Sequence, residues 1–385
     1  VWTVPVDMDP LSTAEASALA RRMAPLRLSP DSLEHEEAVT TNRYTDLLGL
    51  RTLTADEIRE NWKAKPPQEF LRVPLGMDDD GTPVILDLKE SAQLGMGPHG
   101  LCVGATGSGK SELLRTLVLA LMVTHPPERL NMVLVDFKGG ATFAPFEGVP
   151  HVSGIITNLS DETSLISRVH ESLAGEIRRR QEVLKRAGNI SNVTDYEVHR
   201  QEALERGEEW EPLPHLLVII DEFGELLTAQ PDFIDLFLSI GRIGRSIGVH
   251  LLLSSQRIEG GKLRGLDTYL SYRLGLRTLS EAESRTVLDT PDAFHLPAMP
   301  GYGYLKVDTT VYDRFKAGYV SGPLSSLFED EQSIPEPQEV FGPAVVPFSL
   351  GDHRALLDEH ADARRRRSES TPAPAERTTG TTVMG

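Results

Sequence analysis

The feature that most constrains the fold is a glycine-rich stretch, Gly104–Ser111, between a short apolar run and a helical pattern. It reads GATGSGKS, the phosphate-loop pattern of two glycines separated by four residues and followed by Lys and Ser. Glycines let the backbone wrap so that its N–H groups point at an anion, and the following helix adds the positive end of its dipole. The apolar run Leu101–Val103 and the amphipathic segment after the loop are the context that the motif requires. The sequence therefore predicts a loop that binds nucleotide phosphates.

We expect the whole loop and the first turn of the following helix to bind ATP. Lys110 supplies a full positive charge to the phosphates, and Ser111 is predicted to ligate Mg²⁺. The predicted nucleotide-binding residues are Gly104, Ala105, Thr106, Gly107, Ser108, Gly109, Lys110, Ser111 and Glu112.

A second apolar run, His215–Ile220, ends in two carboxylates, Asp221 and Glu222. Sheets of the α/β type bind ligands at the carboxyl ends of their strands. We expect this strand to neighbour the phosphate-loop strand, with Asp221 in the Mg²⁺ shell and Glu222 as the base that orients and polarises the attacking water. Alone, such a run is only a strand that meets a turn, but an intact phosphate loop upstream makes it a strong signal.

The adjacent glutamate also indicates the class of enzyme. RecA-type and AAA+ motor ATPases place a glutamate directly after the magnesium aspartate, whereas GTPases and small-molecule kinases often lack it. These motors also place a polar sensor of the γ-phosphate on the strand beside the acidic one. Gln256, just after the apolar run Val249–Ser254, is the predicted sensor.

Ring motors also use an arginine from a neighbouring subunit to neutralise charge in the transition state. The sequence does not choose among the candidates, and Arg245 is the one we carry forward as a catalytic residue. The candidates are Arg168, Arg178, Arg179, Arg180, Arg242, Arg245, Arg257 and Arg285.

The central part of the chain alternates strand-length apolar runs with helix-period segments. This pattern predicts an α/β fold, a RecA-like P-loop NTPase core with a mainly parallel sheet, helices on both faces and a small N-terminal appendage. Strands are expected at 101–104, 131–137, 154–157, 216–221, 249–254, 273–277 and 303–307, and helices at 110–124, 161–186 and 232–245. A hairpin is expected within 70–89.

We expect three regions: an N-terminal linker or strapping segment over 1–43, an ATPase domain over 44–322, and a C-terminal extension and flexible linker over 323–385. The chain begins at Val1 and not at methionine, so we expect a piece of a longer protein. No run approaches the roughly 18–20 apolar residues that cross a bilayer, so this piece is expected to be soluble.

Composition limits the remaining alternatives. The formal net charge of −18 argues against a surface built to grip nucleic acid, because such binding depends on Lys and Arg. The single cysteine, Cys102, excludes an internal disulfide and a thiolate metal cage, and we expect it to be buried.

The chain resembles the motor domain of the FtsK/SpoIIIE superfamily in five segments, which occur in the same order: 104–111, 221–223, 255–257, 284–288 and 300–303. Within it, the chain is most similar to the EccC ATPases of type VII (ESX) secretion systems. The similarity covers roughly 44–321, and the segments that carry it to EccC are 86–90, 95–101, 135–143, 241–250 and 270–278.

The resemblance implies the first of several tandem ATPase domains in a membrane-anchored protein at the cytoplasmic face of the membrane. It implies ATP-driven export of small helical WXG-type proteins, with substrates bound through a later domain. It further implies a homo-oligomer, expected to be a hexameric ring, together with other secretion-system membrane components. In this family the neighbourhood of Arg245 is associated with contact to the following linker or domain and with restraint of activity. Two alternatives remain, an FtsK-like DNA translocase and a nucleotide-binding scaffold with little turnover.

Overall fold

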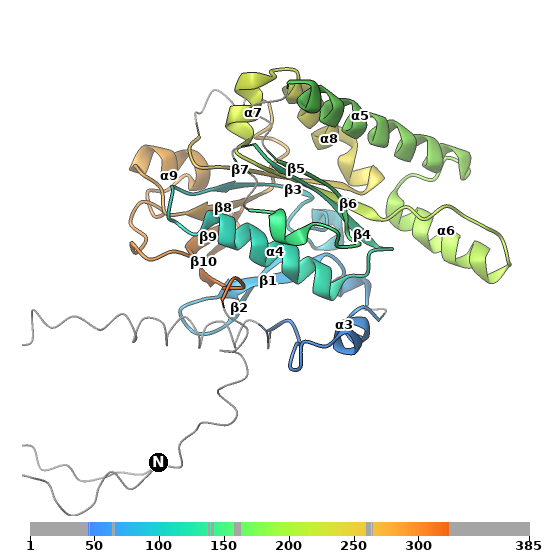
Figure 1. Ribbon diagram of the computed structural model, residues 1–385, viewed down its shortest axis with the longest axis horizontal. Coiled ribbons are helices and arrows are strands. Elements are labelled where there is room, and N and C mark those ends of the chain that lie inside the picture. Colours follow the sequence, from blue (N-terminus) through green and yellow to red (C-terminus); the bar gives the residue numbers. More distant parts are fainter. Residues whose placement is uncertain are drawn as a thin grey trace, which may run out of the picture. The chain divides into compact units, whose positions relative to one another are not determined.

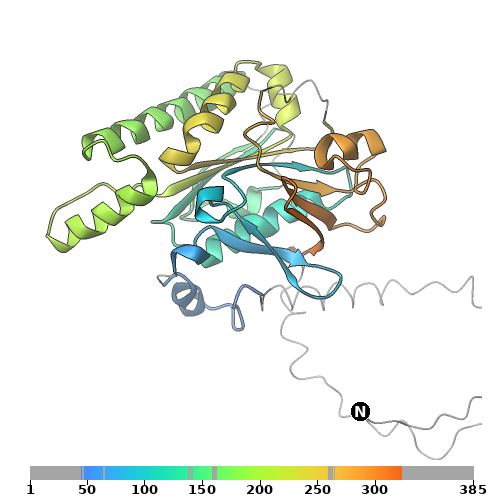
Figure 2. The same cartoon turned by 180° about the vertical axis from the view of Figure 1, so that it is seen from behind.

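The computed structural model describes residues 45, 47–63, 66–137, 139, 142–157, 163–258, 263 and 265–322. The expectations for 1–43 and 323–385 lie outside these residues. Most of the described chain is built around one mixed sheet, shown in Figure 1 and from behind in Figure 2.

The sheet has ten strands in the order β2-β1-β10-β9-β8-β3-β7-β6-β4-β5. Strands β8, β3, β7, β6, β4 and β5 run parallel, and β9, β10, β1 and β2 pair antiparallel beyond β8. The strands are β1 Arg72–Met77, β2 Pro83–Asp87, β3 His99–Val103, β4 Leu130–Asp136, β5 Val152–Thr157, β6 His215–Asp221, β7 Val249–Ser255, β8 Tyr272–Leu276, β9 Tyr302–Val307 and β10 Val311–Ala317. This confirms the predicted α/β class and the mainly parallel core.

Helices cover both faces of the sheet. In Figure 1, α4 lies on the lower side of the sheet, and α5 and α8 lie on the upper side. The helices are α3 Ala55–Asn61, α4 Lys110–Thr124, α5 Thr163–Arg186, α6 Val193–Glu205, α7 Phe223–Ala229, α8 Phe233–Ile247 and α9 Glu281–Leu288.

The alternation of side chains along the strands creates two apolar cores. In β6, Leu217 and Ile219 belong to the core that includes α4, whereas Val218 and Ile220 belong to the core that includes α5 and α8. All four are fully buried. A strand with apolar side chains on both faces belongs in the middle of a covered sheet, as the uninterrupted apolar run predicts.

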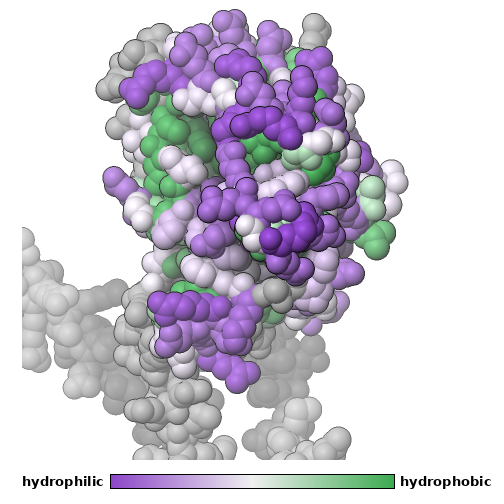
Figure 3. Space-filling model, turned by 90° about the vertical axis from the view of Figure 1, so that its right-hand side faces the viewer, coloured by the Kyte–Doolittle hydropathy of each residue, from purple (hydrophilic) through white to green (hydrophobic). Residues whose placement is uncertain are grey.

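Helices α5 and α6 project together on the right of Figure 1. Figure 3 shows this side of the molecule, where hydrophilic side chains dominate and hydrophobic ones appear mainly in recesses between them. Helix α6 buries only Val193, Tyr196 and Ala203, which explains why its sequence has little helical periodicity.

One predicted pairing of strands is wrong. Strand β6, which carries Asp221, does not pair with the phosphate-loop strand β3, because β7 pairs with both and separates them. The strands are parallel, so their carboxyl ends still meet at one edge of the sheet. The order places the predicted sensor strand β7 directly between the loop and the acidic pair.

Candidate nucleotide site

The phosphate loop connects β3 to α4 through glycines in left-handed backbone. Gly107 and Gly109 have φ of 80° and 91°, which glycine adopts without steric cost. A Cβ on Gly109 would lie 2.5 Å from the backbone nitrogen of Gly301. The N–H of Gly301 donates to the carbonyl of Ser108 at 2.8 Å. The turn before β9 therefore packs against the loop, and position 109 requires glycine for both conformation and space.

Lys110 begins α4, and its ammonium group is buried at the carboxyl ends of β6 and β7. Nζ forms an ion pair with Asp221, lies 3.3 Å from Glu222 Oε1 and donates to Ser254 Oγ at 3.2 Å. Burial alone would lower the pKa of Lys110, but the carboxylates of Asp221 and Glu222 outweigh burial and raise it above its ordinary value. The structure thus brings together three of the predicted site residues around one charged amine.

Asp221 is held in one orientation by neighbours from three elements. Its Oδ1 accepts hydrogen bonds from Ser254 Oγ at 3.0 Å and from the backbone N–H of Glu222 at 3.1 Å. Its Oδ2 accepts from Thr142 Oγ1 at 3.5 Å. A buried carboxylate with fixed lone pairs is suited to bind a cation.

The surroundings of Asp221 fit Mg²⁺ in a nucleotide complex. The ammonium of Lys110 already places a positive charge against the carboxylates of Asp221 and Glu222. Ser111 is half-buried in the same first turn of α4. Mg²⁺ takes oxygen ligands and in nucleotide sites uses one or two carboxylates together with phosphates and water. The remaining ligands of such a site are phosphate and water oxygens. Among the described residues no group of three or more His, Cys, Asp or Glu side chains could hold a metal.

Glu222 has a strained backbone and a buried carboxylate. Its φ and ψ of 61° and 42° are left-handed, which costs a non-glycine residue roughly 1–3 kcal/mol. Its Oε2 accepts from the backbone N–H of Gln256 at 3.3 Å. A cavity of about 450 Å³ adjoins it, lined by Thr106, Gln256 and part of α7. Strain of this kind occurs at sites where function fixes the direction of a side chain.

Gln256 lies between the acidic pair and the phosphate loop. Its side-chain Oε1 accepts a hydrogen bond from Thr106 Oγ1 at 2.9 Å. Its backbone contacts Glu222, as described above. One residue therefore connects the loop to the predicted base, which is the geometry expected for a γ-phosphate sensor.

Glu112 and Arg245 lie apart from this cluster. The carboxylate of Glu112 accepts from the backbone N–H groups of Val320 and Ser321 at 2.8 and 2.9 Å, so its side chain supports the chain after β10. Arg245 lies near the end of α8, close to the amino end of β7, whereas the phosphate loop lies at the carboxyl ends of the parallel strands. It cannot act on the phosphate site of its own chain.

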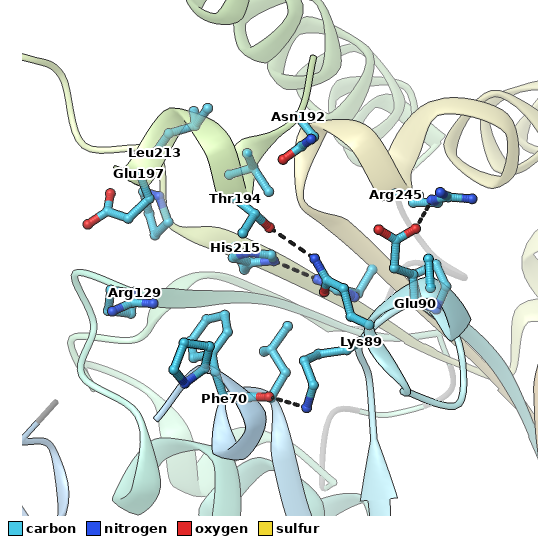
Figure 4. Close-up of a pocket in the computed structure, with 18 of the residues that line it drawn as sticks. Phe70, Lys89, Glu90, Arg129, Asn192, Thr194, Glu197, Leu213, His215 and Arg245 are labelled. Carbon is cyan, nitrogen blue, oxygen red and sulfur yellow. Dashed lines mark hydrogen bonds and ion pairs between the residues drawn. The ribbon is translucent and has the colours of Figure 1, made fainter. Parts of the chain in front are cut away.

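Arg245 forms an ion pair with Glu90 at the rim of a cavity of about 490 Å³ (Figure 4). In the same cavity His215 and His250 stack, with Nδ1 and Nε2 2.8 Å apart. The side chain of Arg245 is 62% exposed, so it is accessible to another domain or subunit.

Other predictions for single residues are resolved by burial. Arg180 is 2% exposed and donates to the carbonyls of Ile247 and Pro214 at 3.0 and 2.7 Å. This arginine is structural and is removed from the candidates that act between subunits. Cys102 is buried, and burial raises the pKa of its thiol to about 12, so it stays protonated as a small apolar residue.

Two residues of the site were not predicted. Ser254 was identified only as the end of a strand, and Thr142 only within the segment 135–143 that resembles EccC. The signal for Ser254 was its place near the end of a buried strand, two residues before the sensor, where a hydroxyl needs a partner. No local signal identifies Thr142, because its contact with Asp221 joins residues far apart in the chain.

The family model for the FtsK/SpoIIIE family matches residues 54–259, more than half of the chain. The chain belongs to the FtsK/SpoIIIE family. Its P-loop ATPase fold agrees with this membership.

Relatives within the family carry more specific names. The chain is 53% identical over 363 residues to the ESX secretion system protein EccC of Thermomonospora curvata, covering 94% of this chain and 27% of that protein. It is 47% identical over 341 residues to the ESX-4 secretion system protein EccC4 of Mycobacterium tuberculosis, covering 89% and 27%. The chain therefore spans about a quarter of the length of these relatives.

A solved structure supports the same assignment. The cytoplasmic domain of the type VII secretion ATPase EccC of Thermomonospora curvata matches with a TM-score of 0.69 and 59% identity, over 73% of this chain and 32% of that one. In the part of this chain that the structure describes, no helix is long and apolar enough to cross a membrane.

Proposed function

We propose that the chain is an ATP-hydrolysing motor domain of a type VII (ESX) secretion system, which couples ATP turnover to export of small helical WXG-type proteins. The observation that carries the ATPase assignment is the convergence of Lys110, Asp221, Glu222 and Gln256 beside the phosphate loop. The similarity to EccC proteins supports secretion as the process that uses the ATP.

The geometry suggests how these residues work. The phosphates of ATP offer Lys110 new partners, and its departure from Asp221 and Glu222 leaves both carboxylates available. Asp221 and Ser111 are the residues that would hold Mg²⁺, which would neutralise phosphate charge when bound. Glu222 orients the attacking water and accepts its proton, and Gln256 contacts the γ-phosphate.

The wider context is also part of the proposal. We propose an ATPase domain over 44–322 between an N-terminal linker at 1–43 and a C-terminal extension over 323–385, within a longer chain anchored in the membrane. The domain works in a homo-oligomer, a hexameric ring, at the cytoplasmic face, with other secretion components. WXG-type substrates bind mainly to a later domain. Nucleic acid is not a partner.

Arg245 is proposed to restrain activity through contact with the following linker or domain. Its exposure and its place at the amino edge of the sheet support this role. In a longer protein that includes the next ATPase domain, Arg245→Ala should raise the ATPase rate several-fold. Arg206→Ala, at the exposed residue that directly follows α6, is the matched control and should leave the rate unchanged. Equal rates for the Arg245 variant and the unmodified protein would contradict the role.

The main alternative, a DNA translocase, is tested by ATP turnover with and without duplex DNA over a range of salt concentrations. A secretion motor should show no stimulation at any salt concentration. Stimulation that falls steeply with salt would favour the translocase, because contacts with DNA phosphates release counterions.

A further inference from the structure

Thr142 follows the end of β4, and its hydroxyl reaches the proposed magnesium carboxylate. Oγ1 donates to Asp221 Oδ2 at 3.5 Å, and its backbone N–H donates to Asp136 Oδ2 at 3.4 Å. Asp136 and Asp221 are register partners at the ends of the neighbouring strands β4 and β6. All three side chains are buried. Thr142 therefore bridges the carboxyl ends of two strands at the point where the nucleotide site is expected.

Arg115, one turn into α4, holds Thr142 in place. Its Nε donates to the carbonyl of Thr142 at 2.9 Å. Its guanidinium lies 3.6 Å from the carboxylate of Glu112 and donates to Ser321 Oγ at 3.3 Å. Arg115 is thus fixed by contacts on several sides, and the helix that carries Lys110 is tied to the loop that contacts Asp221.

The two oxygens of Asp221 have different partners. Oδ1 interacts with Lys110, Ser254 and the N–H of Glu222, whereas Oδ2 is held by Thr142. When Lys110 turns to the phosphates, the hydroxyl groups of Ser254 and Thr142 keep the carboxylate from rotating. A fixed carboxylate loses less conformational entropy when it takes up a cation.

We infer that Thr142 is a positioning residue for Mg²⁺ binding, and that it orients Asp221 while Arg115 fixes Thr142. This inference rests on the proposed function. A hydrogen bond to a charged group has a moderate net effect on free energy, and the bond from Thr142 Oγ1 to Asp221 Oδ2 is long. Removing this bond should therefore weaken Mg²⁺-dependent nucleotide binding about tenfold.

The test is binding of a fluorescent ATP analogue to the 385-residue chain, once with saturating Mg²⁺ and once with EDTA. Thr142→Val removes the hydroxyl and keeps the side-chain shape, and Thr142→Ser is the matched control that keeps the hydroxyl. The valine variant should bind about tenfold more weakly with Mg²⁺ and within about twofold of the unmodified chain in EDTA. The serine variant should remain within about twofold in both.

The outcomes separate the two proposals. An unmodified chain that binds no ATP in either condition sinks the proposed function. Unchanged Mg²⁺-dependent binding in Thr142→Val, or an equal loss in EDTA, overturns the positioning role alone. If circular dichroism shows that the valine variant does not fold, Arg115→Lys is measured instead, because it keeps the charge and removes the Nε donor to Thr142. If Arg115→Lys weakens binding of the analogue only when Mg²⁺ is present, the inference is supported. If binding is unchanged, the inference is overturned.

Discussion

Lys110 holds the centre of the site by pairing with Asp221 and Glu222 together. The buried amine and the two buried carboxylates stabilise each other, and removing one of them would leave uncompensated charge in a poorly solvated position. We propose that the same contacts also keep Glu222 from acting as the base until phosphates compete for the lysine. On this proposal, one ionic cluster contributes both to stability and to control of the reaction.

Glu222→Gln should separate ATP binding from hydrolysis. Glutamine keeps the size of the side chain but cannot accept the proton of the attacking water, so turnover should fall by about 10²- to 10⁴-fold. Binding of ATP should be retained, because Lys110 and the phosphate loop are unchanged. Turnover is measured by phosphate release and binding by a fluorescent analogue, with Glu205→Gln, at an exposed position of α6, as the control. Turnover that survives in the Glu222 variant would show that another group is the base.

Among single residues, the sequence predicted those whose roles depend on local patterns. Gly104–Ser111, Asp221 and Glu222 are contiguous motifs beside apolar runs, and the structure brings Lys110 against both carboxylates. Thr142 could not be predicted, because its role depends on how a loop folds back onto another strand. The position of Arg245 relative to the site could not be predicted either, because it depends on the topology of the sheet.

Among the elements, the connection from β3 to α4 is the most strictly determined. The predicted helix 110–124 matches α4, since the loop defines its start and Pro126 follows closely on its end. Glycine at 109 is required by backbone and by space, whereas Gly107 has a left-handed φ but open surroundings. Alanine substitutions at these two positions therefore separate the cost of the left-handed backbone from the cost of the steric clash.

Gly109→Ala should damage both the fold of the loop and ATP binding, and Gly107→Ala should do so less. A left-handed alanine costs about 1–2 kcal/mol at either position, and at 109 the Cβ also collides with the backbone of Gly301. We expect the free energy of unfolding to fall by about 1 kcal/mol for Gly107→Ala and by at least about 3 kcal/mol for Gly109→Ala. Urea denaturation measures both. An equal decrease in the free energy of unfolding for both variants would mean that the contact with Gly301 adds no cost at position 109.

Elements with strong periodicity were predicted well, and polar or short elements were not. All seven predicted strands are present, with ends shifted by a residue or two. Strand β10 was missed because Asp313, Arg314 and Lys316 interrupt its apolar residues, and the hairpin β1–β2 was not expected to extend the sheet through β10. Pairings between distant strands depend on tertiary contacts that periodicity does not encode.

For the molecule as a whole, the amino edge of the sheet contains buried histidines that should make stability depend on pH. Burial lowers the pKa of His99 to about 4 and that of His250 to about 3. Both stay neutral in the folded chain, whereas the unfolded chain takes up their protons below about pH 6.5. The free energy of unfolding must therefore decrease as pH falls from about 6.5 towards 4.

At pH 5 the loss should reach about 2 kcal/mol for each buried imidazole, compared with pH 7.5. Urea denaturation at the two pH values measures it. His99→Asn should reduce the dependence on pH, and the exposed His199→Asn should leave it unchanged. A free energy of unfolding that is equal at both pH values would contradict the burial of these groups.

We propose that this chain is a domain of a hydrolytic motor whose site is completed by an arginine from a neighbouring subunit. The most direct test is the rate of phosphate release per subunit as the concentration of the chain rises, with Mg²⁺ and ATP saturating. The rate per subunit should increase steeply with concentration. A rate that stays at zero at every concentration, with ATP bound, would contradict it and identify a nucleotide-binding scaffold.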